Sequence, residues 1–351
     1  MLNLPRAVCF LSCGYSTAYT RPPFYRLVTI SPDHQGVNLP QKDNQKQAAN
    51  NGIQVKMHKG EMDINIALVR QLLAEQFPHL AKRPVTLVRS TGTVNAIFRI
   101  GDDLCARLPR VAEWAKSLNR EWEWLPKIAP HISLAIPQPV VKGKPTNTYP
   151  YSWAIYRWIE GASYQDDLIN DERQVARDLA NFIMELQGVA MQGAPSGGRA
   201  PLIELDAATR SVIETLRGVI DTEAVLELWT RSLEVPPWNG KPVWIHGDLL
   251  KSNLVVRDGR LCAVVDFGGV GIGDPAADIV PAWSVFNKVG RETFRRALVV
   301  DDNTWCRACG YALHQALMII PYYPDTNPEF VIMAKRTVNE ILTDFSKISR
   351  Y

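Results

Sequence analysis

The sequence has little net charge and no long apolar run, and both absences narrow what the protein can do. Its 39 Lys and Arg residues nearly balance 36 Asp and Glu residues, which gives a formal net charge of +3. Such a small basic excess does not indicate a nucleic-acid partner. No apolar stretch approaches the ~18 residues that a membrane-spanning helix needs. We therefore expect a protein that binds neither nucleic acid nor membrane.

Cysteine is scarce, and its spacing does not suggest a disulfide framework. The six cysteines are Cys9, Cys13, Cys105, Cys262, Cys306 and Cys309. We therefore expect reduced thiols and a cytoplasmic protein. Cys306-x-x-Cys309 resembles half of a zinc site, but no second pair follows, and Trp305, Leu313 and Leu317 suggest an amphipathic helix around it. Packing inside that helix is therefore favoured over metal binding.

The composition is that of a globular enzyme, with 351 residues of which 46% are hydrophobic and 21% are charged. That length suffices for two lobes, each with its own core. Residues 1–56 differ, because they are polar and turn-rich and show no sustained period. We expect them to be disordered or a non-core extension. Met57 is then an alternative start of the folded protein, in which case deleting residues 1–56 leaves activity intact.

Residues 57–158 have the pattern of a small mixed lobe. A helix is expected over about 64–77, where Ile66, Val69 and Leu73 recur at helical spacing. Strands are expected at 85–89, 94–100, 104–108 and 152–158, a second helix at 113–128, and a stiff extended connector at 136–139. This order of elements predicts an antiparallel sheet flanked by a helix.

Residues 159–351 are mostly helical in pattern. Helices are expected at 175–189, 206–219, 222–233 and over most of 276–351, with a Gly/Pro-rich loop at 192–201. Asp274-Pro275 is expected to start a helix, because Asp can cap it and Pro fits its first turn. The predicted fold class is α+β, with one lobe at 57–158 and the other at 159–351.

Two short motifs in the second lobe carry aspartates eighteen positions apart, Asp248 and Asp266. Residues 246–253 read HGDLLKSN, which has the form H-x-D-L-x-x-x-N, and residues 266–268 read DFG. Apolar, strand-like runs flank both motifs, and the protein-kinase signature contains both in this order. Together they indicate phosphoryl transfer from a nucleotide.

Three residues of these motifs are of the types that phosphoryl transfer needs. The reaction depends on positioning and on neutralising phosphate charge with Mg²⁺, a cation that takes oxygen ligands. Asp266 offers a carboxylate and Asn253 an amide oxygen, which leaves Asp248 to accept or orient the proton of an incoming hydroxyl. A hairpin with strands at 254–257 and 261–265, turning at Asp258-Gly259, is expected to bring Asn253 beside Asp266.

Three polar neighbours of these motifs are expected to have structural roles. A lone histidine is more often a satisfied core residue than a catalyst, so we expect His246 to brace the loop that carries Asp248. Asp274 is expected to cap the helix that Pro275 begins. Asp278, one turn further on, is expected to accept hydrogen bonds from the loop at 246–253.

From about Val85 to Phe286, the chain resembles the aminoglycoside phosphotransferase family, relatives of protein kinases that phosphorylate small molecules. The likeness rests on HGD with Asn253, VDFG at 265–268 and GDPAAD at 273–278. Gly247 stands where protein kinases usually carry an Arg that pairs with a phosphorylated activation loop, so regulation by such a phosphate is not expected. The resemblance implies a bilobal kinase-like fold that binds ATP or GTP with Mg²⁺ between its lobes. Asp248 is then catalytic, and Asn253 and Asp266 hold the metal.

The resemblance also implies nucleotide-binding residues in the first lobe. The matching loop reads STGTVN at 90–95, and backbone N–H groups in such a loop can cradle phosphate oxygens. Its candidate binding residues are Ser90, Thr91, Gly92, Thr93 and Asn95. The backbone of about Tyr156 to Trp158 corresponds to the inter-lobe hinge, which is expected to hydrogen-bond a purine.

The third predicted strand departs from the kinase pattern. Kinases place a Lys there, paired with a helix Glu, whereas this strand carries Arg107, and Arg is not equivalent to Lys. Glu121 is the expected partner of Arg107, and Glu123 is expected to lie in solvent. Arg110 is the fallback for the phosphate-binding role. An ordinary surface position for Arg107 stays an alternative.

The acceptor pocket is expected in the second lobe, where composition leaves the substrate open. From residue 278 to residue 351, eight acids stand against nine Lys and Arg residues, which is not the acidic wall that a polycationic aminoglycoside favours. Aromatic residues are plentiful there, although Trp305 and Tyr311 are expected in the core. A macrolide or a metabolite with an alcohol group fits equally well.

Three functions remain open on the sequence. The leading one is an ATP-dependent or GTP-dependent O-phosphotransferase that acts on a small-molecule hydroxyl, as a monomer or homodimer. The second is a metabolite kinase of related fold, of the choline, homoserine or sugar type. The third is a nucleotide-binding pseudoenzyme that acts as an interaction module. Such a pseudoenzyme is expected to have lost Asp248, Asn253 or Asp266, and all three are present.

Overall fold

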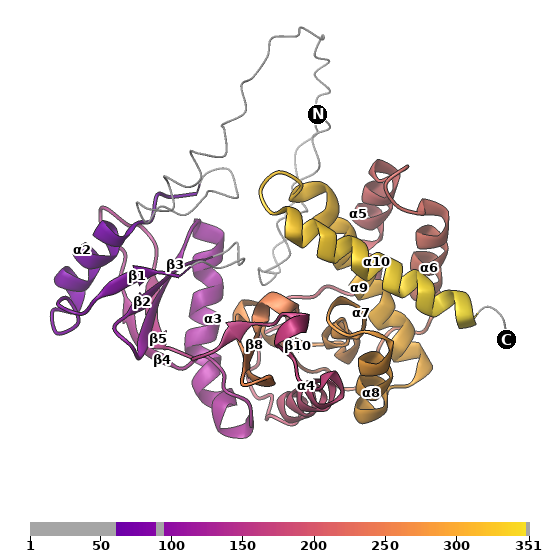
Figure 1. Cartoon of the computed structure of the whole chain (residues 1–351), viewed down its shortest axis with the longest axis horizontal. Coiled ribbons are helices and arrows are strands. Elements are labelled where there is room, and N and C mark those ends of the chain that lie inside the picture. Colours follow the sequence, from indigo (N-terminus) through magenta and orange to yellow (C-terminus); the bar gives the residue numbers. More distant parts are fainter. Residues whose placement is uncertain (1–60, 89–94, 349–351) are drawn as a thin grey trace, which may run out of the picture.

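The structure is a computed structural model that describes residues 61–88 and 95–348 in two lobes (Figure 1). The predictions for residues 1–56 and for Ser90, Thr91, Gly92 and Thr93 lie outside the described residues. The predicted α+β class is confirmed by an antiparallel sheet in the first lobe and a mostly helical second lobe. The division between residues 158 and 159 stays a prediction.

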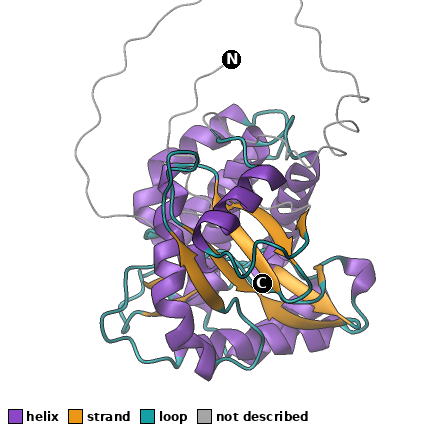
Figure 2. Ribbon diagram, turned by 90° about the vertical axis from the view of Figure 1, so that its left-hand side faces the viewer, coloured by secondary structure: helices purple, strands orange, loops and turns teal. Residues whose placement is uncertain are grey.

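The first lobe is built on a five-stranded antiparallel sheet with the order β1-β2-β3-β5-β4. Its strands are β1 (Val85–Leu87), β2 (Asn95–Ile100), β3 (Leu104–Pro109), β4 (Pro139–Gly143) and β5 (Trp153–Arg157). Figure 2 shows strands of the molecule side by side with helices around them. The predicted connector at 136–139 ends where β4 begins, and the sequence predicted no strand there, because an edge strand that opens with proline lacks a strong strand pattern.

Two helices flank this sheet, α2 (Ile66–Gln76) and α3 (Ala112–Ile128), both close to their predicted positions. Helix α2 buries Val69, Leu72 and Leu73 in a core that the sheet completes, which follows from their helical spacing. Helix α3 instead packs on the core of the second lobe, where the ring of Trp124 lies 5.0 Å from that of Trp244. Helix α3 therefore joins the two lobes.

The second lobe is a group of helices around α9 (Figure 1). Its helices are α4 (Glu172–Gln187), α5 (Leu202–Thr215), α6 (Thr222–Glu234), α7 (Pro281–Ser284), α8 (Lys288–Leu298), α9 (Asp302–Tyr322) and α10 (Pro328–Ile348). Helix α9 is buried from Thr304 to Ile320, because α5, α6 and α10 all pack on it. Cys306 and Cys309 are buried in α9, so the prediction of packing cysteines is confirmed.

Short strands carry the two sequence motifs. They are β6 (Ala162–Ser163), β7 (Val243–Ile245), β8 (Leu254–Arg257), β9 (Arg260–Val264) and β10 (Gly271–Gly273), with 3-10 turns η2 (Ala129–His131), η3 (Asp166–Leu168), η4 (Lys251–Asn253), η5 (Phe267–Gly269) and η6 (Pro275–Asp278). Strands β8 and β9 form the predicted hairpin, and its turn has φ of 54° at Asp258 and 75° at Gly259. Pro275 begins a short 3-10 turn, whereas the sequence predicted a longer helix there.

No helix within residues 61–88 and 95–348 combines the length and the apolar character that crossing a bilayer requires.

Candidate active site

The β8–β9 hairpin brings Asn253 and Asp266 together, as predicted. Leu254 pairs with Val264 in the ladder, and the Val265 N–H donates to the Asn253 carbonyl over 2.9 Å. The two side chains lie at neighbouring ends of the hairpin because Asn253 directly precedes β8 and Asp266 follows β9 by two residues. Both line the same cavity.

Asp266 has an unusual backbone conformation, with φ of 65° and ψ of 65°. This left-handed region is sparsely populated by residues other than glycine, although Asp tolerates it better than most. The carboxylate is 24% exposed, and its Oδ1 accepts a hydrogen bond from Arg107 Nη2 over 3.0 Å. A rare conformation of this kind is often maintained at functional sites.

Arg107 lies in a buried network and is not an ordinary surface arginine. Its Nη1 donates to both carboxylate oxygens of Glu121, over 2.9 and 2.7 Å, which confirms the predicted pairing. The Tyr156 hydroxyl donates to the same carboxylate over 3.0 Å. Burial opposes the charge of Arg107, but Glu121 and Asp266 outweigh it and raise the pKa of Arg107 above its ordinary value. The guanidinium is therefore charged beside Asp266.

The fallback residue Arg110 lies elsewhere. Its Nη1 donates to Glu61 over 3.1 Å in a buried ion pair, and it is not among the residues that line the cavity around Asp266. Glu123 is exposed and pairs with Lys127 on the outer face of α3, as expected for a solvated position. Arg107 is thus the arginine that the fold places beside Asp266.

Asp248 is held at both carboxylate oxygens. Asn253 Nδ2 donates to its Oδ2 over 3.1 Å and to its carbonyl over 2.8 Å. Gln315 Nε2 donates to its Oδ1 over 2.7 Å, and Arg199 Nη2 lies 3.7 Å from the same oxygen. Burial raises the pKa of Asp248 to about 7, although Arg199 opposes the shift. A carboxyl that titrates near neutral pH suits proton transfer.

His246 braces the loop, as predicted. Its Nδ1 accepts from the Asp248 N–H over 3.2 Å, so its Nε2 carries the proton that faces the Val265 carbonyl at 3.1 Å. The ring lies 4.6 Å from that of Phe267. Burial lowers the pKa of His246 to about 4, so the imidazole is neutral at physiological pH. One neutral ring therefore links both motifs.

Asp278 and Asp274 have the structural roles expected of them. The Asp278 carboxylate accepts the N–H groups of His246 and Gly247 over 2.7 and 2.8 Å. Gly247 has φ of 81°, a conformation that an Arg side chain at this position would strain. Asp274 caps η6 through the Ala276 N–H and also pairs with Arg307 over 2.7 Å. These contacts fix the loop that presents Asp248.

A cavity of about 390 Å³ lies between the sheet and the hairpin. Its apolar lining includes Ile97, Cys105, Val255 and Val265, and its polar lining includes Asn95, Arg107, Asn253 and Asp266. Among the described residues, no group donates a hydrogen bond to the buried Asn95 Oδ1. The cavity thus has an apolar part and, at one end, a set of charged and amide groups.

The backbone of about Tyr156 to Trp158 stays a predicted purine contact, and two of its N–H groups have main-chain partners. The Trp158 N–H donates to the Asp103 carbonyl over 2.8 Å, and the Arg157 N–H donates to the Gln138 carbonyl over 2.9 Å. Other main-chain carbonyls therefore accept from these two N–H groups, and Tyr156 and Trp158 line the cavity. The Tyr156 side chain points to α3, where its hydroxyl donates to Glu121. Ile159 and Gly161 come just after Trp158 in the chain and also line the cavity.

Arg199 and Gln315 were missed by the sequence reasoning. Arg199 follows two glycines in the 192–201 loop, and its Nε donates to the Gly247 carbonyl over 2.6 Å. No local pattern marks that contact. Gln315 did offer a signal, because it is an uncharged polar residue within the apolar stretch of α9. A polar side chain in a fully buried helix position usually has a partner.

Residues 86–312, well over half of the chain, match the family described as "Phosphotransferase enzyme family". The chain belongs to this family. The predicted resemblance is therefore confirmed. No curated protein matches the sequence.

Solved structures share the fold of this phosphotransferase. A GDP complex of a mutant aminoglycoside 2'-phosphotransferase-IIIa has a TM-score of 0.66 and 20% identity, over 80% of this chain and 99% of that one. A GDP and kanamycin complex of APH(2")-IIia has a TM-score of 0.61 and 19% identity over the same shares. The macrolide 2'-phosphotransferase type I has a TM-score of 0.56 and 18% identity, over 78% of this chain and 97% of that one. The predicted kinase-like fold is confirmed.

Proposed function

We propose that this phosphotransferase moves the γ-phosphoryl group of ATP or GTP to a hydroxyl of a small molecule. Asp248 is the proposed catalytic residue, Asn253 and Asp266 the proposed Mg²⁺ ligands, and Arg107, held by Glu121, the proposed phosphate ligand. The observation that carries the proposal is one cavity lined by Arg107, Asn253 and Asp266, with Asp248 hydrogen-bonded to Asn253 at its edge.

The donor set fits Mg²⁺. Since the Asn253 Nδ2 is used on Asp248, the atom that Asn253 can offer to a cation is its Oδ1. Asp266 supplies a partly exposed carboxylate beside it. One or two protein oxygens suffice, because Mg²⁺ keeps waters and takes phosphate oxygens as its other ligands. When bound, Mg²⁺ neutralises phosphate charge.

Asp248 acts on the acceptor. Its carboxylate is oriented by Gln315 and Asn253, and its remaining lone pairs can accept the proton of a hydroxyl that approaches the γ-phosphorus. Arg107 carries positive charge next to Asp266, where the phosphates of a bound nucleotide must lie if Asp266 holds their metal. Positioning and charge neutralisation are the main contributions that phosphoryl transfer requires of a protein.

The cavity suits a nucleotide. Its volume of about 390 Å³ lies within the range of small-molecule sites, and Ile97, Val255 and Val265 offer apolar contacts to a purine. Tyr156 and Trp158 line this cavity, and the backbone of about Tyr156 to Trp158 is the proposed contact with the base. The printed names of structural relatives include GDP and ADP, and both ATP and GTP stay open for this chain. A phosphate cradle at residues 90–95 also stays a prediction.

The acceptor is proposed to carry few positive charges. A second cavity of about 620 Å³ is lined by Arg199, which also lies beside Asp248, and by Trp238 and Tyr311. Its one acidic lining residue, Asp274, is paired with Arg307. Relatives named for kanamycin and for macrolides share the fold. This lining favours a macrolide-like or other weakly charged alcohol over a polycation. A cytoplasmic location and a monomeric or homodimeric state complete the proposal.

The test is a panel of macrolides, aminoglycosides and alcohol-bearing metabolites, each incubated with Mg²⁺ and ATP or GTP. We expect a mass gain of one phosphate on a weakly charged member, and no gain with the Asp248→Ala variant. Mg·nucleotide binding without phosphate transfer to any member would support the pseudoenzyme alternative. Transfer by Asp248→Ala at the rate of the unmodified protein would contradict the assigned role of Asp248.

A further inference from the structure

Helix α9 reaches the proposed catalytic residue through a single side chain. Gln315 is 2% exposed, and its Nε2 donates to Asp248 Oδ1 over 2.7 Å. Its neighbours on the same helix face, Ala312, Ala316 and Ile319, are apolar and cannot make such a contact. The only described side-chain hydrogen bond from α9 to Asp248 therefore comes from Gln315.

The hydrogen bond from Gln315 is the second of two that hold the Asp248 carboxylate. The torsion about the Cβ–Cγ bond of an Asp side chain is broad, so one hydrogen bond leaves the carboxylate free to turn. Asn253 holds Oδ2 from within the loop, and Gln315 holds Oδ1 from the opposite side. Two donors on different oxygens fix the plane of the carboxylate and thus the direction of its unused lone pairs.

We propose that Gln315 is a positioning residue, which orients the Asp248 carboxylate toward the acceptor hydroxyl from helix α9. The inference rests on the proposed function, because it assumes that Asp248 receives that proton.

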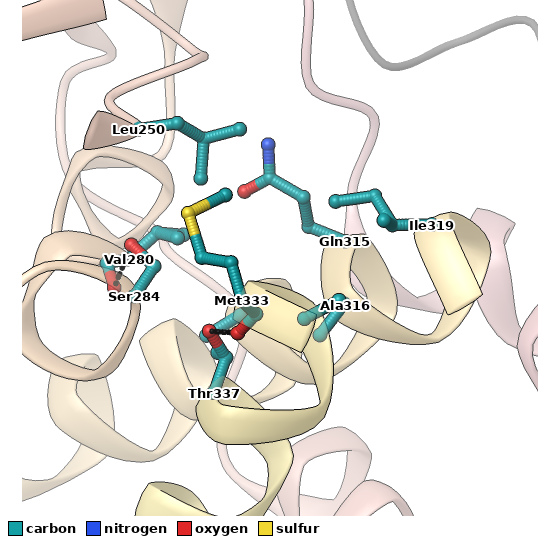
Figure 3. Close-up of a pocket in the computed structure, with 10 residues that line it drawn as sticks. Leu250, Val280, Ser284, Gln315, Ala316, Ile319, Met333 and Thr337 are labelled. Carbon is teal, nitrogen blue, oxygen red and sulfur yellow. Dashed lines mark hydrogen bonds between the residues drawn. The ribbon is translucent and has the colours of Figure 1, made fainter. Parts of the chain in front are cut away.

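The surroundings of Gln315 oppose a purely structural role. Its amide oxygen points into a small pocket between Leu250 and Met333, whereas its nitrogen points away from that pocket (Figure 3). The pocket holds about 10 Å³, which is room for at most one water. Within the described part of the chain, no donor contacts this oxygen. A Met or Leu would fill such a site without leaving a buried acceptor unpaired, so packing alone does not explain an amide here.

The orientation of the amide also agrees with the role. An ionised carboxylate only accepts hydrogen bonds, so the amide must present its nitrogen to Asp248. The oxygen is then left facing the pocket. Gln315 thus makes its hydrogen bond to Asp248 at the expense of a partner for its own oxygen.

The first experiment compares the Gln315→Met variant with the unmodified protein in steady-state assays. Met matches the length of Gln and fills the pocket but cannot donate. We expect kcat to fall about 10- to 100-fold, as for a misplaced catalytic group, with the Kd for Mg·nucleotide unchanged. Thr337→Val is the matched control, because Thr337 lines the same pocket from α10 and bonds only the Met333 carbonyl. We expect its kcat to stay within about twofold.

The second experiment combines Gln315→Met with Asp248→Asn. If Gln315 acts through Asp248, its substitution changes the residual rate of Asp248→Asn by less than about threefold. An equal loss in both backgrounds would overturn the proposal. Should Gln315→Met fold poorly, Gln315→Leu is also apolar and lacks the donor, and kcat must again fall. Unchanged kcat in a folded variant overturns the role of Gln315 alone, whereas full turnover by Asp248→Asn overturns the proposed function.

Discussion

Arg107 and Glu121 join the sheet of the first lobe to helix α3 through two hydrogen bonds from one guanidinium nitrogen. The sequence suggested this pair, and the structure adds that the same guanidinium reaches Asp266 with its other nitrogen. Three elements far apart in the chain therefore meet at one buried cation. The pair thus helps to set where the lobes meet around the nucleotide cavity.

The Glu121→Ala variant is expected to be less stable and to bind nucleotide more weakly. The substitution removes one of the two carboxylates that pair with the buried Arg107 and leaves only Asp266, and the loss of a buried ion-pair partner costs about 3 kcal/mol. Urea unfolding measures the stability, and calorimetry measures the Kd for Mg·ATP. Glu123→Ala is the control on the same helix, because Glu123 is exposed, and its effect on unfolding should stay below about 0.5 kcal/mol. Equal effects of the two substitutions would contradict this prediction.

The Asp248→Ala variant is expected to lose turnover while it keeps nucleotide binding. General base catalysis contributes about 10²- to 10⁴-fold, so kcat should fall by that factor. The Kd for Mg·ATP should change little, because Asp248 is not among the residues that line the 390 Å³ cavity. Steady-state kinetics and calorimetry on the same preparation separate the two effects. A large loss of nucleotide affinity would place Asp248 among the nucleotide ligands instead.

The Asp266→Asn variant is expected to weaken nucleotide binding only when Mg²⁺ is present. Asn also tolerates the left-handed backbone at this position, so the substitution removes charge without adding strain. Calorimetric titration with ATP, in Mg²⁺ and in excess chelator, measures both affinities. We expect a drop of about tenfold or more in Mg²⁺ and a small change without it. An unchanged affinity in Mg²⁺ would contradict the metal assignment.

His314 is expected to make stability depend on pH. It is buried on α9 beside Thr209 and the Trp229 ring, and burial lowers its pKa to about 3. The unfolded chain takes up a proton below about pH 6.5, whereas the folded protein keeps His314 neutral. Acidification therefore favours the unfolded state, and this residue lowers the free energy of unfolding by about 2 kcal/mol between pH 7 and pH 5.

Urea unfolding of the unmodified protein and of His314→Asn at both pH values tests that prediction. The variant lacks the titrating ring, so its stability should fall less over this range. The other buried groups, including His246, are present in both proteins and cancel in the comparison. Parallel curves for the two proteins would show that His314 does not titrate as stated.

The elements predicted from sequence were those whose patterns are local. Helices α2 and α3 follow from apolar spacing, and the β8–β9 hairpin follows from two short apolar runs around Asp258-Gly259. Strand β4 was missed because it opens with proline at the edge of the sheet and so lacks a strong strand pattern. The partner of the Trp158 N–H was not predicted either, since it lies in a different strand connection.

The sequence by itself determined the core of the candidate site. A hairpin joins Asn253 and Asp266, and Asp248 precedes Asn253 by five residues in one loop, so their proximity follows from short-range geometry. Only the tertiary structure decided how Asp248 is held, because Gln315 is 67 residues from it in the chain and Arg199 comes from a separate loop. Contacts between distant segments depend on how the helices pack around α9, and no periodicity in the sequence encodes that packing.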